Sequence, residues 1–169
     1  MSEISSGVMA RHNKKEELEA YIEELNIEDN IGFIYSINDS WVGLFLADEY
    51  LMDGDSIDIL NKISMTMPLL YLYNSEDYGW GLKIFSQGKP PAEFACPYIL
   101  EEWMELVIEG IEPEAFRLFE IDMDTSLRAT QLLTSGSTSP ELFMEFKEII
   151  GLEEFRWMSY SYLIDKIVE

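Results

Sequence analysis

Cysteine and histidine are almost missing from this sequence of 169 residues. It holds a single cysteine, Cys96, and a single histidine, His12. One cysteine cannot form an intrachain disulfide, and one histidine leaves Ser-His-Asp triads, Cys-His pairs and multi-histidine metal sites without their parts. Glycine-rich phosphate-binding motifs of the GxGxxG and GxxxxGK[ST] types are missing too. The sequence therefore predicts a protein that is not an enzyme and has no cofactor.

Long hydrophobic runs are missing as well. No apolar stretch approaches the roughly 18 residues that span a bilayer. The first fifteen residues lack the apolar core of a secretory signal. Together with the single cysteine, these absences predict a cytoplasmic protein that does not interact with membranes.

Basic residues are scarce. The chain has 11 Lys+Arg against 33 Asp+Glu, for a net charge of -22. The acids run through the whole chain, since residues 16–97 carry 16 acids against three bases and residues 98–169 carry 16 against five. Such a charge repels the phosphates of nucleic acids and anionic lipid heads. The charge favours a basic protein as the partner and excludes direct nucleic-acid binding.

The apolar content is high enough for a folded protein. Hydrophobic residues make up 47% and aromatic residues 13% of the chain, so burial can offset the entropy lost on folding. Residues 1–12 show no clear periodicity, and we expect them to form a flexible N-terminal leader. Because no Pro/Gly/Ser-rich linker separates the strand-rich first part from the helix-rich second part, we expect residues 13–169 to form a single α+β domain.

Strands are predicted in the first part of the chain. Alternating or continuous apolar residues, separated by turn-forming residues, predict five strands. Their ranges are 31–37, 41–47, 69–73, 80–85 and 91–96. The short connections indicate hairpins, and so antiparallel pairing.

Helices are predicted mainly in the second part. Apolar residues at helical spacing indicate a helix before the first strand and another between the second and third. They indicate four more after residue 98, while residues 155–158 are expected to be extended. The expected ranges are 14–25 after a cap at Asn13, 56–67 after a cap at Asp55, 100–111, 126–133, 140–150 and 160–168, with a short helix around Phe116 and Phe119. The expected fold is thus α+β, with a roughly five-stranded, mostly antiparallel sheet, helices packed on one face and a helix-rich C-terminal half.

A metal site is not expected. Asp53, Asp55 and Asp58 in the segment MDGDSID supply the hard oxygen ligands that calcium prefers. Gly54 follows the first aspartate directly, however, whereas an EF-hand loop has its glycine at the sixth position. Capping of a helix by Asp55 explains these acids without a metal.

A candidate interaction segment joins the third and fourth predicted strands. Glu76, Asp77, Tyr78 and Trp80 combine two acids with two large aromatic side chains, and aromatic side chains are favoured anchors in interfaces. The alternative is that Trp80 belongs to the core, because it shares its side of the strand with Leu82 and Ile84.

The functional hypothesis follows from these features. We expect an acidic protein-binding module that acts on a basic partner, in the manner of an immunity or antitoxin protein or of a nucleic-acid mimic. The alternative is a small-ligand binder or an enzyme with a pocket of carboxylates and aromatic residues. The sequence leaves the oligomeric state open.

Overall fold

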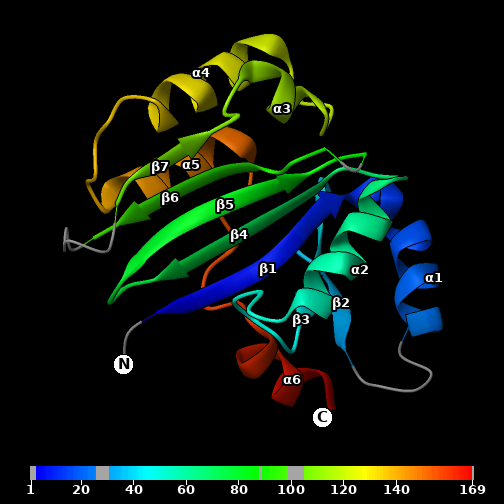
Figure 1. Cartoon of the computed structure of the whole chain (residues 1–169). Helices are drawn as coiled ribbons and strands as arrows, with labels where there is room; N and C mark the ends of the chain where they lie inside the picture. Colours follow the sequence, from blue (N-terminus) through cyan, green and yellow to red (C-terminus); the bar gives the residue numbers. More distant parts are fainter. Residues whose placement is uncertain (1–2, 26–30, 88, 99–104, 169) are drawn as a thin grey trace.

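The strands join in one antiparallel sheet that helices cover on both sides (Figure 1). The computed structural model describes residues 3–25, 31–87, 89–98 and 105–168. In this part the strands are β1 (Ile4–Arg11), β2 (Gly32–Ser36), β3 (Trp41–Leu46), β4 (Leu69–Ser75), β5 (Gly79–Phe85), β6 (Ala92–Pro97) and β7 (Val107–Glu109). The helices are α1 (Lys15–Leu25), α2 (Gly54–Ser64), α3 (Pro113–Arg117), α4 (Met123–Leu133), α5 (Glu141–Ile150) and α6 (Tyr160–Val168).

The strand order in the sheet is β2-β3-β1-β4-β5-β6-β7. Every neighbouring pair is antiparallel, from Phe33 opposite Phe45 at one edge to Ala95 opposite Val107 at the other. This confirms the α+β class and the antiparallel pairing. The sheet has seven strands in the described chain, however, where the sequence predicted about five. The two additional strands are β1 and β7.

Strand β1 corrects the prediction of a flexible leader over residues 1–12. It lies between β3 and β4 in the middle of the sheet, and residues 5–10 are buried. Its N-terminal half contains Ser5, Ser6 and Gly7, and the only apolar run of the strand is the short stretch from Val8 to Ala10. The small and polar side chains of this strand give no alternating apolar pattern in the sequence. The strand is central because neighbouring strands bury it, which the sequence pattern does not show.

Strand β7 corrects the predicted helix over residues 100–111. Val107–Glu109 pair with β6 at the edge of the sheet, and Gly110 adopts a positive φ of 67° just beyond them. Residues 99–104 of the predicted helix lie outside the described residues.

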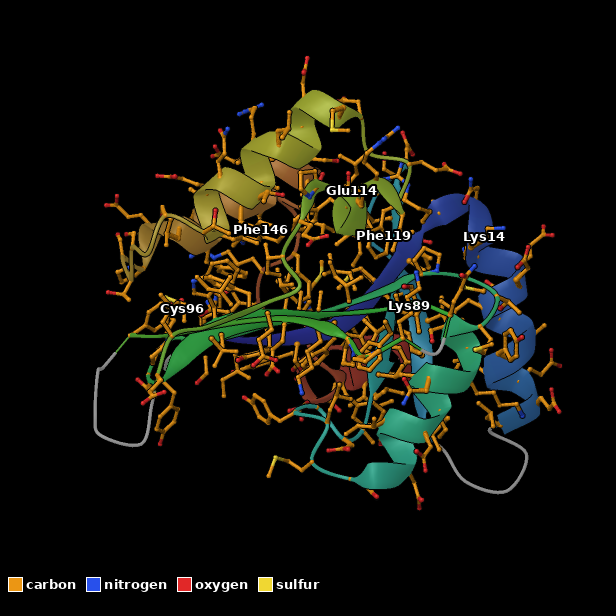
Figure 2. The ribbon with its side chains drawn as sticks, turned by 45° about the horizontal axis from the view of Figure 1, so that its top comes forward. Lys14, Lys89, Cys96, Glu114, Phe119 and Phe146 are labelled. Carbon is orange, nitrogen blue, oxygen red and sulfur yellow. The ribbon has the colours of Figure 1, made fainter. Side chains whose placement is uncertain are left out.

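Helices α3, α4 and α5 cover one face of the sheet. Figure 2 shows Phe119 and Phe146 in the layer between these helices and the strands. Trp80 lies in the same layer, with its ring centroid 5.3 Å from that of Phe143 and 5.7 Å from that of Phe146. Burial of such large aromatic side chains supplies much of the hydrophobic stabilisation of this half of the core.

Helices α1 and α2 cover the opposite face, but only over one end of the sheet (Figure 1). The buried side chains of this second core come from α1, α2 and the strands β1, β3 and β4, with Phe85 from β5. The prediction of helices on one face is therefore wrong. Helix periodicity shows which side of a helix is apolar but not to which face of the sheet it packs.

The helix boundaries follow local capping chemistry. Asp53, and not Asp55 as predicted, caps α2, since its side chain accepts a hydrogen bond from the backbone N–H of Asp55. Asp122 caps α4 in the same way, through the N–H of Thr125, and these bonds hold the pKa of Asp122 below its usual value. Helix α5 ends at Gly151, which adopts the left-handed conformation with φ of 79°.

Candidate functional site

The half of the sheet that α1 and α2 leave uncovered is hollowed. A cavity of about 790 Å³ lies there; we call it the tyrosine cavity. Its described lining residues are Ile4, Tyr50, Tyr73, Ser75, Asp77, Tyr78, Gly79, Trp80, Ala95, Cys96, Pro97, Glu105 and Val107. They come from β1, β4, β5, β6, β7 and three connecting segments, so the sheet assembles the cavity from distant parts of the chain.

Tyr73 lies across the floor of the cavity. It stands on β4 directly opposite Gly81 of β5, and a Cβ atom added to Gly81 would lie 2.5 Å from the Tyr73 hydroxyl oxygen. The absent side chain at Gly81 thus lets the Tyr73 ring lie flat on the strand. Burial, with a smaller effect of the Glu93 carboxylate, raises the pKa of Tyr73 to about 12.

A second tyrosine fixes the position of the first. The ring centroid of Tyr71 lies 5.6 Å from that of Tyr73, and the Tyr71 hydroxyl donates a hydrogen bond of 2.8 Å to the backbone carbonyl of Glu49. Burial raises the pKa of Tyr71 strongly. Both hydroxyls therefore remain protonated and neutral at physiological pH.

The rim carries two exposed tyrosines. Tyr78, in the turn between β4 and β5, is 63% exposed, and Tyr50, in the loop after β3, is 42% exposed. The Tyr50 loop is held by Glu49, whose Oε1 accepts hydrogen bonds from Ser161 N at 2.7 Å and Ser161 Oγ at 2.6 Å. These bonds attach the loop to the first turn of α6.

The charge of the cavity is negative. Asp77 and Glu105 belong to its described lining residues, which include no lysine, arginine or histidine. Lys83 lies on the same side of β5 as Gly81, and its Nζ is 3.9 Å from Glu93 Oε1. Aromatic rings bordered by carboxylates make up a site that attracts cations and repels anions.

The structure divides the predicted interaction segment between the two faces of the sheet. Asp77 and Tyr78 line the tyrosine cavity. Trp80 is fully buried, and its ring packs on the opposite side against Phe94 and Phe143, as the core alternative predicted. Glu76 faces away from the cavity, and its Oε2 accepts a hydrogen bond from Glu3 N at 2.9 Å.

Glu76 borders a second, smaller cavity of about 410 Å³. Its polar side chains are largely engaged with one another and with the backbone. Tyr98 donates a bond of 2.6 Å to Asn74 Oδ1, and the buried Glu3 accepts bonds from Ser5 Oγ and Trp157 N. The Ser6 amide also donates to the Met158 carbonyl at 2.8 Å. This cluster fastens the segment before α6 to the start of β1.

Of the three candidate metal ligands, only Asp53 caps helix α2. Asp53 bonds the N–H of Asp55, and Asp48 accepts bonds from Met52 N and Asp53 N. Asp55 and Asp58 are exposed. Within the described ranges, no three His, Cys, Asp or Glu side chains come together as a metal site.

The lone cysteine is buried between strands. Cys96 is a free thiol that is 1% exposed and lies opposite Trp80 in the β5–β6 pair. Burial raises the pKa of the thiol, and the nearby Trp80 indole lowers it to a smaller extent. The indole N–H of Trp80 has no hydrogen-bond partner among the described residues. A thiol with a raised pKa is a poor nucleophile, so Cys96 acts as a small apolar side chain here.

Among the tyrosines and carboxylates that line the cavity, sequence reasoning missed Tyr50, Tyr73 and Glu105. For Tyr73 a signal was present, because it alternates with the apolar residues of 69–73 and so faces the side opposite to Leu70 and Leu72. Tyr50 lies in a loop without periodicity, and Glu105 lies on the polar side of the helix that was predicted over residues 100–111. Neither pattern indicated the cavity.

Comparisons of this chain with protein-family models, with curated proteins and with solved structures found no match. Among the helices of the described segments, none has the length and apolar character needed to cross a bilayer.

Proposed function

We propose that this chain is a protein-binding module that engages a basic protein through the uncovered half of its sheet. The observation that supports this most directly is the tyrosine cavity, where exposed Tyr50 and Tyr78 stand beside Asp77 and Glu105. Tyrosine is enriched at binding sites, since it buries a large area at a small entropic cost. The carboxylates give such a surface a preference for cationic partners.

The charge of the rest of the molecule points in the same direction. The net charge is -22, and the ion pairs found in the described residues are Lys14–Glu17, Lys15–Glu19 and Lys83–Glu93, at 3.5, 3.8 and 3.9 Å. Exposed pairs of this kind neutralise little of the surrounding field. A strong negative field accelerates the encounter with a basic protein and slows the approach of nucleic acids.

An inhibitor of a basic enzyme is the form of this function that we favour. An immunity or antitoxin protein, or a mimic of nucleic acid, presents carboxylates where a basic active site expects phosphates. The free thiol of Cys96 is compatible with a reducing compartment. We propose that the chain meets its partner in the cytoplasm.

The test is capture of partners by the full chain at low salt, with a charge-neutralised variant beside it. Asp77→Asn with Glu105→Gln removes two negative charges at the cavity. Glu145→Gln with Glu148→Gln removes two exposed charges from α5 on the opposite face and serves as the matched control. The proposal predicts a basic protein that is held by the wild type and the control, is lost from the cavity variant and is released by moderate salt.

A result with no basic protein, or with equal capture by both variants, would contradict the proposal.

The volume of about 790 Å³ supports a second candidate, a small cationic ligand, because it falls in the range of small-molecule sites. That candidate predicts saturable binding of a small amine or guanidine compound in the absence of any protein partner.

A further inference from the structure

We propose that the tyrosine cavity receives an arginine side chain of the basic partner. This inference rests on the proposed function and specifies the group that the cavity binds. Arginine carries a flat, weakly hydrated cation that stacks on aromatic rings and forms paired hydrogen bonds with carboxylates. The cavity offers both kinds of contact.

The aromatic contacts come from three directions. Tyr73 lies on the floor, pressed onto Gly81, while Tyr50 and Tyr78 stand at the rim and are 42% and 63% exposed. Exposed rings of this kind allow a guanidinium group to lie over or between them, since the negative face of an aromatic ring attracts a cation. Because burial raises the pKa of Tyr73 to about 12, its hydroxyl stays neutral and accepts a hydrogen bond without adding a charge.

The carboxylates come from two separate segments. Asp77 lies in the turn between β4 and β5, and Glu105 lies just before β7, at the edge of the sheet. Both line the same cavity. A guanidinium group has five N–H donors in a fixed plane, so it can bond to carboxylates on two sides of a cavity at once.

The chemistry of the cavity favours arginine over the other groups that a basic partner presents. A lysine ammonium group is a compact, strongly hydrated charge that gains less from flat aromatic walls. Neutral side chains lack the charge that Asp77 and Glu105 attract, and anionic groups are repelled by these carboxylates. The described lining includes no lysine, arginine or histidine, so its charge is negative.

The inference can be tested with three short peptides that differ in one side chain. The peptides are acetyl-Gly-Xaa-Gly-amide with arginine, lysine or citrulline, where citrulline is the neutral analogue of arginine with nearly the same shape. Each peptide is titrated into the full chain, and the NMR signals of the tyrosine rings of the protein are followed. We expect the arginine peptide to bind with a dissociation constant about tenfold lower than that of the citrulline peptide, as for a charge-assisted hydrogen bond in a partly enclosed site.

The variants locate the binding. The double variant Asp77→Asn with Glu105→Gln is expected to bind the arginine peptide about tenfold more weakly. The control Glu145→Gln with Glu148→Gln is expected to bind it with unchanged affinity. Tyr78→Ala, a substitution at an exposed position, is expected to weaken binding severalfold while the melting temperature stays the same. Equal affinity of the arginine and citrulline peptides, or unchanged binding in the cavity variant, would overturn the inference.

A negative result in the peptide experiment can be distinguished from a negative result in the capture experiment. If a basic protein depends on Asp77 and Glu105 but the arginine peptide binds no better than citrulline, the specificity for arginine is wrong and the proposed function remains. If the arginine peptide binds at the cavity and no basic protein does, the proposed function is wrong. The inference about the arginine of a partner then fails with it.

Discussion

Lys147 is an unusual residue, because it is a lysine buried in the aromatic core. It lies on α5, is 2% exposed, donates a hydrogen bond of 2.9 Å to the Phe155 carbonyl and stands 4.5 Å from the centroid of the Phe143 ring. Burial lowers its pKa below the ordinary value of 10.5, although the Glu3 carboxylate opposes this effect. The charged form is therefore less favourable in the folded chain than in the unfolded chain.

Because Lys147 is buried, its titration makes the free energy of unfolding depend on pH. Between its lowered folded pKa and 10.5, the unfolded chain binds more protons than the folded one, so the free energy of unfolding rises with pH. Lys147→Met keeps an unbranched side chain and removes the titration. We expect the stability of the wild type relative to this variant to increase from pH 7 towards pH 10 in urea unfolding. A difference that stays constant or shrinks with pH would show that Lys147 has an ordinary pKa.

The residues that the sequence placed correctly are those whose environment follows from strand alternation alone. Trp80 could be assigned to the core because Leu82 and Ile84 share its side of β5, and all three are buried. The position of Lys147 could not be predicted in this way. Its burial depends on Phe155, which meets α5 only after the chain has turned at Gly151.

At the scale of elements, β1 shows the same limit. Residues 5–7 carry small side chains, and at Gly7 a larger one would not fit, which is visible only when the neighbouring strands are known. A Cβ atom on Gly7 would lie 2.7 Å from Cε1 of the Phe45 ring and 3.0 Å from Cε of Met9. The absence of a side chain at Gly7 is thus a consequence of close packing in the middle of the sheet.

A pair of glycine substitutions tests this packing. Gly7→Ala is expected to lower the free energy of unfolding by about 1–3 kcal/mol, since the Phe45 ring must shift. Gly54→Ala, at the start of α2, meets no atom within 4 Å and is expected to be neutral or to stabilise by about 0.5 kcal/mol. The free energies of unfolding of the two variants are compared with that of the wild type by urea unfolding. Equal effects would mean that β1 is not packed against β3 as described.

Helix α6 depends on a loop that is distant in sequence. Ser159 caps the helix through the N–H of Tyr162 at 3.3 Å, and Glu49 adds two shorter bonds from Ser161. A carboxylate at a helix N-terminus is also favoured by the helix dipole. Glu49 therefore stabilises α6 and holds the Tyr50 loop at the rim of the tyrosine cavity.

Glu49→Gln tests this connection. We expect the free energy of unfolding to fall by about 1 kcal/mol, because a neutral amide oxygen then accepts the hydrogen bonds of Ser161 in place of a carboxylate. We also expect faster hydrogen exchange of the α6 amides. Glu145→Gln on α5 changes the same charge at an exposed position and serves as the control. If the two variants exchange and unfold alike, Glu49 has no special role at α6.

The whole molecule is dominated by its charge, whose role differs between the interior and the surface. The acids supply the exposed sides of the helices, and two core layers with few charged groups lie beneath them. The folded chain nevertheless gathers a net charge of -22 in a smaller volume than the unfolded chain does. Self-repulsion therefore opposes folding, and it is screened over distances of about 10 Å at 0.1 M salt.

Added salt should for this reason stabilise the protein. From about 20 to 200 mM sodium chloride, a range in which screening dominates, we expect the melting temperature to rise by about 3 °C. This rise corresponds to about 1 kcal/mol for a chain of this size. The exposed ion pairs of Lys14, Lys15 and Lys83 weaken under the same conditions, but each contributes too little to reverse the effect. Glu145→Gln with Glu148→Gln should show a smaller rise, since it begins with two fewer charges. A melting temperature that falls steadily over this range would mean that attractive surface pairs outweigh the net repulsion.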